Sequence, residues 1–153
     1  LIAIPLFYQS NKYLTYYFTY YAEKESVEWQ YGMKEIVSFI AKNQNKYNQV
    51  YMVNIRQQPY IFYLYYLQTP LPKLLKTVKY DESNDKSFNT VLSYSKYVFS
   101  GWDPVEAYPS MGTLYVMTPY NYTGIRMKDA FDVDKIVKYP GGGEAFYLVS
   151  GNE

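Results

Sequence analysis

Three polar side chains near the middle of the chain could bind an anion or a sugar. Arg56, Gln57 and Gln58 come directly after the apolar run 50–55, and Tyr60 lies in the helix predicted to follow. The planar guanidinium group of Arg56 suits bidentate contact with a phosphate or a carboxylate, and the glutamine amides can bind hydroxyl groups. The alternative is an ordinary connecting loop, and the absence of a glycine-rich loop argues against a nucleotide site.

A tryptophan beside two carboxylates forms a second candidate. Trp102 and Asp103 lie in a predicted turn after a strand, and Glu106 follows. An aromatic ring can stack on the C–H face of a pyranose, while a carboxylate accepts hydrogen bonds from the sugar hydroxyls. Two carboxylates at a suitable separation would also serve a glycosidase. The alternative is a solvated loop with Trp102 anchored in the core.

Both candidates follow predicted strands, so we expect them to emerge at the same edge of a sheet, where open α/β sheets bind ligands. The single ligand site predicted in this way comprises Arg56, Gln57, Gln58, Tyr60, Trp102 and Asp103. None of these residues is predicted to be catalytic.

Composition excludes several classes of chemistry. The chain has no Cys and no His, which removes thiol nucleophiles, zinc sites and imidazole bases. Asp129, Asp132 and Asp134 alternate with other residues but do not fit a calcium-loop pattern, and we interpret them as a solvated helix end. A net charge of +1 with dispersed lysines argues against nucleic acid as a partner. No metal and no cofactor is therefore predicted.

Tyrosine dominates the first element, and the chain holds 22 tyrosines in all. Residues 6–22 are predicted to form a helix, because Tyr13, Tyr16, Tyr17 and Tyr20 fall on one face. This face suits the membrane interface, or it packs on the core of the chain's own domain. The preceding apolar run 1–7 is too short to span a membrane.

The remaining pattern predicts one α/β domain. A helix over 26–43 starts at Ser26 and buries a stripe that begins at Trp29. The other predicted elements are strands 50–55, 96–99 and 113–118, a helix 59–68, a loop 80–90, and a hairpin of 136–139 with 145–149. We therefore expect a three-layer α/β domain over 23–153, with a central mixed sheet and a C-terminal β-hairpin. Residues 1–22 form a separate N-terminal juxtamembrane segment.

Four stretches in this order resemble bacterial membrane glycosyltransferases. These are multi-spanning enzymes that use polyprenyl-phosphate sugars and are related to protein O-mannosyltransferases. The stretches are EWQYGMKE at 28–35, QPYIF at 58–62, TLYV at 113–116 and YPGGGEAFY at 139–147. The last departs from the family pattern, which has Asp-Gly where this chain has three glycines.

The resemblance implies an extracytoplasmic C-terminal domain at the cell membrane. Catalysis in this family uses acidic residues of an early loop that this sequence does not contain, so the chain is expected to be inactive alone. Its expected partners are the membrane portion of the parent chain and either a glycan acceptor or a polyprenyl-phosphate sugar donor.

Two other functions fit the residues. One is a free-standing extracellular carbohydrate-binding or scaffolding module. The other is a glycosidase that uses a pair of acidic residues. The upstream gene sequence separates the first two, because membrane spans would support the glycosyltransferase and a signal peptide would support the module.

Overall fold

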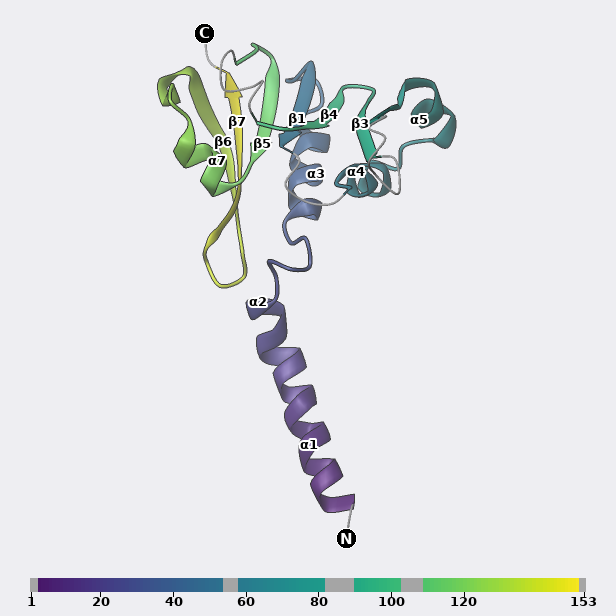
Figure 1. The fold of residues 1–153 in the computed structure, drawn as a ribbon, viewed down its shortest axis with the longest axis vertical. Coiled ribbons are helices and arrows are strands. Elements are labelled where there is room, and N and C mark those ends of the chain that lie inside the picture. Colours follow the sequence, from purple (N-terminus) through teal and green to yellow (C-terminus); the bar gives the residue numbers. More distant parts are fainter. Residues whose placement is uncertain (1–2, 54–57, 82–89, 103–108, 152–153) are drawn as a thin grey trace.

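The computed structural model describes residues 3–53, 58–81, 90–102 and 109–151, which form a mixed α/β fold (Figure 1). Within these residues a seven-stranded sheet has the strand order β2-β3-β4-β1-β5-β7-β6. Its central strands are parallel to one another: β1 (Gln49–Val53), β4 (Tyr97–Ser100) and β5 (Thr113–Met117). The antiparallel strands are β2 (Lys79–Asp81), β3 (Thr90–Tyr94), β6 (Phe131–Lys138) and β7 (Glu144–Gly151). The predicted central mixed sheet and C-terminal hairpin are confirmed.

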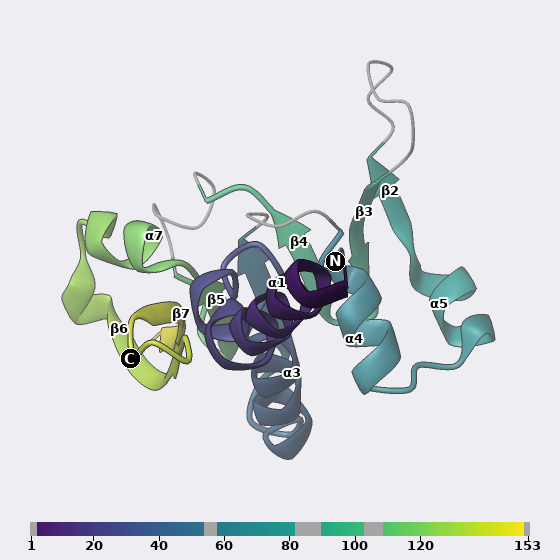
Figure 2. The same cartoon turned by 90° about the horizontal axis from the view of Figure 1, so that it is seen from below.

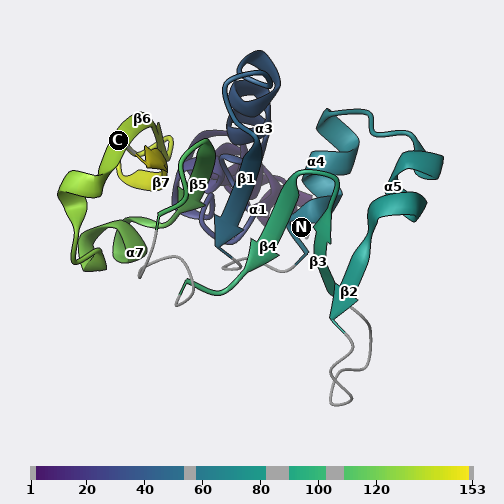
Figure 3. The same cartoon turned by 90° about the horizontal axis from the view of Figure 1, so that it is seen from above.

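Helices cover both faces of this sheet. Helices α3 (Met33–Lys42) and α4 (Tyr60–Tyr66) pack on one face, and α7 (Pro119–Gly124) packs on the other (Figure 3). Strand β5 shows the division, because Leu114 and Val116 join the cluster around α3 while Tyr115 and Met117 join the cluster beside α7. All five residues of β5 are buried, as expected for a strand covered on both faces. We call these groups the α3-side cluster and the α7-side cluster.

A long helical segment precedes the domain. It consists of α1 (Ala3–Tyr16), a π-helical turn η1 (Tyr17–Tyr21) and α2 (Ala22–Lys24). We call residues 3–24 the stalk, because they project away from the sheet and its helices (Figure 1). Figure 2 views this segment nearly end-on. None of the stalk residues is buried, so its tyrosines do not pack on the domain core. Among the described residues, no helix is both long and apolar enough to cross a membrane.

The predicted helix over 26–43 is wrong in its first part. Helix α3 begins only at Met33, and residues 26–32 form turns. Gln30 and Gly32 both have positive φ, at 53° and 93°, which interrupts the helix. Ser26 does not cap a helix but donates a hydrogen bond to the carbonyl oxygen of Glu23 at 3.1 Å. Trp29 is therefore not part of the buried stripe and is 70% exposed.

Several short elements were not predicted from the sequence. They are β2, β3, α7 and the helix α5 (Leu71–Thr77). Pro70 and Pro72 lie at the start of α5, a position at which helices tolerate proline. The predicted loop 80–90 contributes its ends to β2 and β3, and residues 82–89 lie outside the described part. Asp132 and Asp134 lie in β6 and not at a helix end.

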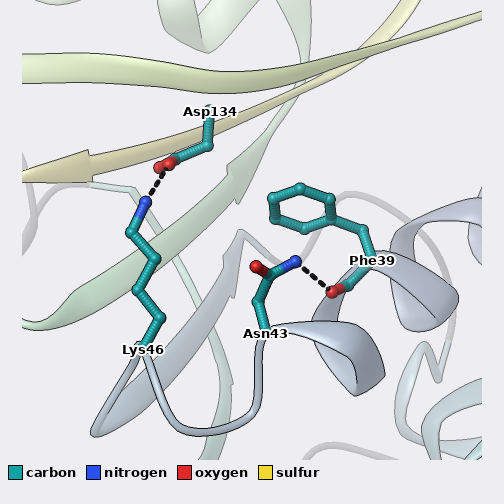
Figure 4. Close-up of polar contacts among 4 residues, drawn as sticks. All are labelled: Phe39, Asn43, Lys46 and Asp134. Atoms are coloured by element: carbon teal, nitrogen blue, oxygen red, sulfur yellow. Dashed lines mark hydrogen bonds and ion pairs between the residues drawn. The ribbon is translucent and has the colours of Figure 1, made fainter.

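An ion pair connects the loop after α3 to β6, an edge strand of the sheet. Lys46 of this loop pairs with Asp134 of β6 (Figure 4). Asn43, at the end of α3, donates its side-chain amide to the carbonyl oxygen of Phe39 at 2.8 Å (Figure 4). Glu35 of α3 also pairs with Lys135 of β6 at 2.8 Å. Helix α3 is thus fixed to β6 by charged contacts as well as by its apolar face.

Candidate functional site

The structure describes three of the six residues of the sequence-predicted site. Arg56, Gln57 and Asp103 lie outside the described residues, so the complete site stays a prediction. Gln58 has a φ of 53°, and its carbonyl oxygen accepts a hydrogen bond from the Ile61 amide at 3.2 Å. Gln58 thereby helps to form the first turn of α4.

The two aromatic residues of that predicted site lie against different faces of the sheet. Tyr60 packs against the α3-side cluster, and Trp102 packs against the α7-side cluster. Beside Trp102, the Tyr51 hydroxyl donates a hydrogen bond to the carbonyl oxygen of Gly101. The structure therefore does not bring the rings of Tyr60 and Trp102 together. Both rings are partly buried and pack on apolar side chains.

A cleft of about 530 Å³ lies elsewhere, between the segment that precedes and opens α3 and the helix α4. Residues 29–35 and Ser38 line one side of the cleft, and Phe62 and Tyr66 of α4 line the other. We call it the Trp29 cleft. Its lining residues belong to α3, to α4 and to the segment between the stalk and α3. Figure 1 shows that this segment connects the stalk to α3.

The backbone of residues 30–32 shapes this cleft. Gly32 has a φ of 93°, a conformation that favours glycine. A Cβ atom on Gly32 would lie 3.1 Å from Val137 Cγ1 and 3.2 Å from Phe146 Cδ2. The β6–β7 hairpin therefore leaves little room for a side chain at this position. The left-handed turn at Gly32 thus packs residues 30–32 against the β6–β7 hairpin, and Trp29, just before this turn, is exposed. Gln30 also has a positive φ, 53°, and a residue other than glycine that is held in this sparsely populated conformation is strained.

The stalk holds the exposed Trp29 ring. The indole Nε1 of Trp29 donates a hydrogen bond to the hydroxyl oxygen of Tyr21 at 2.9 Å. The two rings lie 6.4 Å apart between centroids, at an interplanar angle of 60°. The orientation of an otherwise solvent-exposed tryptophan is thus fixed from outside the domain.

The cleft combines aromatic faces with a few polar groups. Trp29, Tyr31 and Tyr66 all expose ring surface, and Phe62 adds a half-buried ring. Lys34, Glu35 and Ser38 supply donors and acceptors along the same wall. An apolar concave surface with a small number of polar groups is typical of small-molecule sites.

The described lining of the Trp29 cleft holds few groups that could serve acid–base catalysis. Of the described residues that line it, Glu35 is the only carboxylate, and Glu35 already pairs with Lys135. Glycosidase chemistry in its usual form needs two carboxyl groups across the scissile bond. Burial raises the pKa of the Tyr63 and Tyr94 phenols, but both lie in the α3-side cluster and stay protonated there.

Sequence reasoning missed this cleft because it placed Trp29 on the buried stripe of a helix. The signal that could have revealed it is Gly32, which costs about 1 kcal/mol relative to alanine inside a helix. Read as a helix start, Gly32 would have left residues 26–31 in a loop with an exposed tryptophan.

No family model, curated protein or solved structure matches the chain. The interpretation of the cleft therefore rests on the side chains of this chain. Residues 29–35, which line one wall of the Trp29 cleft, fall within the stretch 28–35 from which we expect a resemblance to membrane glycosyltransferases.

Proposed function

We propose that this chain is a glycan-contacting accessory domain of a membrane glycosyltransferase, placed on the extracytoplasmic face of the membrane. The observation that carries the proposal is the exposed Trp29 ring, held by Tyr21 at the mouth of an aromatic cleft. Glycan acceptors and the sugar of a polyprenyl-phosphate donor share the chemistry that this cleft would recognise.

A sugar suits the cleft for a physical reason. The C–H groups of one pyranose face are weakly positive and pack on the negative face of an aromatic ring. The hydroxyl groups around the sugar's edge then need donors and acceptors, which Lys34, Glu35 and Ser38 can supply. An exposed indole that is already oriented loses less conformational entropy when it binds a ligand.

The accessory role follows from what the cleft contains. Its described lining has one carboxylate, which is ion-paired, so bond cleavage or transfer would need groups from elsewhere in a parent chain. The resemblance places those groups in a membrane-proximal loop of the parent. We therefore expect residues 1–153 alone not to turn over a polyprenyl-phosphate sugar.

A free-standing carbohydrate-binding module is the second candidate, because it would use the same cleft. The gene upstream of this chain distinguishes the two: a series of membrane spans supports the glycosyltransferase, and a signal peptide supports the module.

Calorimetric titration with a panel of oligosaccharides and short-chain prenyl-phosphate sugars tests the glycan contact. Trp29→Ala should abolish measurable heat of binding for a sugar that the unmodified chain binds. Tyr120→Ala is the matched control, since Tyr120 is an exposed ring on α7 that does not line the cleft. Equal affinity in both variants, or no binding across the panel, would contradict the proposal.

A further inference from the structure

The domain end of the stalk is held by specific contacts on two sides. Ser26, just after the stalk, is buried, and its hydroxyl donates a hydrogen bond to the carbonyl oxygen of Glu23 at 3.1 Å. The Glu23 side chain lies against the turn of the β6–β7 hairpin, since a Cβ atom on Gly141 would be 3.5 Å from Glu23 Cγ. On the other side, Trp29 donates its hydrogen bond to Tyr21. The stalk therefore meets the domain in a defined geometry.

Tyr21 also contacts two aromatic rings that lie further along the stalk. Tyr17 stacks on Tyr21 with a centroid separation of 5.3 Å and an interplanar angle of 24°. Tyr16 meets Tyr21 edge-on, at 6.4 Å and 72°. Because the Tyr21 ring also lies 6.4 Å from the Trp29 ring, ring contacts run without a break from the stalk to the mouth of the Trp29 cleft.

The π-helical turn Tyr17–Tyr21 explains why Tyr16 reaches Tyr21. In an α-helix a side chain neighbours those three and four positions away, and a residue five positions away points about 140° round the axis. A π-helix closes its hydrogen bonds between residues five apart, which brings such a pair onto one side. Thr19, inside the turn, donates its hydroxyl to the carbonyl oxygen of Thr15, a type of bond that often bends helices. The form of this turn therefore determines how many rings contact Tyr21.

From these contacts we infer that Tyr16 and Tyr17 are positioning residues of the Trp29 cleft, which fix the Trp29 indole through Tyr21. The inference rests on the proposed function for its consequence, which is that the form of the stalk sets the affinity for a glycan. If the π-helical turn became regular α-helix, Tyr16 would leave Tyr21, and Trp29 would lose more conformational entropy when it binds a sugar. By linkage, a bound glycan would favour the π-helical turn to the same extent.

NMR relaxation of the Trp29 indole N–H in the full 153-residue chain tests the positioning without any ligand. The heteronuclear Overhauser effect of this group falls when the group moves more freely, and it should fall in Tyr16→Ala, which removes one of the two stalk rings that contact Tyr21. Tyr16→Phe keeps the ring and should restore the value of the unmodified chain. Tyr8→Ala is the matched control, since Tyr8 is an exposed ring of α1 further from Tyr21 in the sequence, and it should leave the value unchanged.

Titration with an oligosaccharide that the unmodified chain binds gives the second readout. Tyr16→Ala should weaken the affinity about twofold to tenfold, the worth of one aromatic contact, while Tyr16→Phe and Tyr8→Ala should bind as the unmodified chain does. An unchanged Trp29 Overhauser effect in Tyr16→Ala, or an equal fall in Tyr8→Ala, would overturn the inference. A fall confined to Tyr16→Ala with no sugar bound by any of these proteins would support the positioning and contradict the proposed function. Far-ultraviolet circular dichroism verifies that each variant keeps its helices, and neither substituted position is buried.

Discussion

Two side-chain contacts lie on either side of α3, and each connects two different parts of the structure. One is the hydrogen bond from Trp29 to Tyr21, which joins the cleft to the stalk. The other is the ion pair between Lys46 and Asp134, which joins the loop after α3 to β6. Each predicts a distinct consequence of a conservative substitution.

Tyr21→Phe removes the oxygen that accepts the Trp29 indole hydrogen bond and leaves the ring in place. We expect glycan affinity to fall by about threefold to tenfold, the worth of one hydrogen bond that orients a binding group. Fluorescence anisotropy of Trp29, measured in a Trp102→Phe background, should decrease because the indole moves more freely. Tyr20→Phe is the matched control, and identical behaviour of the two variants would show that Tyr21 has no positioning role.

Asp134→Asn should change the pH dependence of stability. Burial opposes ionisation of Asp134, but polar contacts with Lys46, Ser150 and Tyr47, together with the charge of Lys46, outweigh it and hold the pKa of Asp134 below its ordinary value. A depressed pKa contributes stability above the unfolded pKa of about 4, and this stability is lost as the pH falls through the folded pKa. Urea unfolding should therefore show a loss of about 1 kcal/mol at neutral pH and a flatter acid limb in the variant. An acid limb identical to that of the unmodified chain would contradict the assignment.

At the scale of elements, the turn at Gly32 determines where α3 begins and where Trp29 points. Gly32→Ala must place a Cβ atom in a left-handed backbone and within 3.2 Å of two apolar side chains. We expect a loss of about 2–4 kcal/mol in the free energy of unfolding, from backbone strain and crowding together. The control Gly124→Ala meets no atom within 4 Å and should change the free energy by about 0.5 kcal/mol or less. Urea denaturation of both variants decides the point, and a mild effect at Gly32 would refute the tight fit.

An element could be predicted from the sequence when the hydrophobic pattern of its own residues specified it clearly. The runs at 50–55 and 113–118 were identified as buried strands because they are short and apolar throughout. The hairpin was identified from its glycines between two apolar runs. Strands β2 and β3 are short, and pairing with neighbouring strands determines them more than their local pattern does. Helices α5 and α7 are also short but carry local start signals: each has a proline in its first turn, and the Thr118 hydroxyl caps α7.

The candidate site was harder to predict than the fold. Tyr60 lies in α4 and Trp102 lies in the bend after β4, and the order of strands does not determine which face of the sheet such segments cover, so the separation of the two rings could not be predicted. The exposure of Trp29 depends on the positive φ at Gln30, and a glutamine in a sequence does not indicate such a conformation.

At the scale of the whole molecule, the domain and the stalk make separable contributions. The domain core is built from α3, α4, α7 and the sheet, and the stalk contributes no buried residue to it. Deleting residues 1–20 should therefore leave the urea midpoint of the domain nearly unchanged. A large drop in the midpoint would show that the stalk belongs to the folding unit.

The central claim is that Trp29, and not Trp102, contacts the glycan. The chain has two tryptophans, so an amide-correlation NMR spectrum contains two indole N–H signals, which the variants Trp29→Phe and Trp102→Phe assign. Titration of the unmodified chain with an oligosaccharide that it binds should shift the Trp29 indole signal and leave the Trp102 indole signal in place. A shift of the Trp102 signal with an unmoved Trp29 signal would contradict the account and favour the site predicted around Arg56.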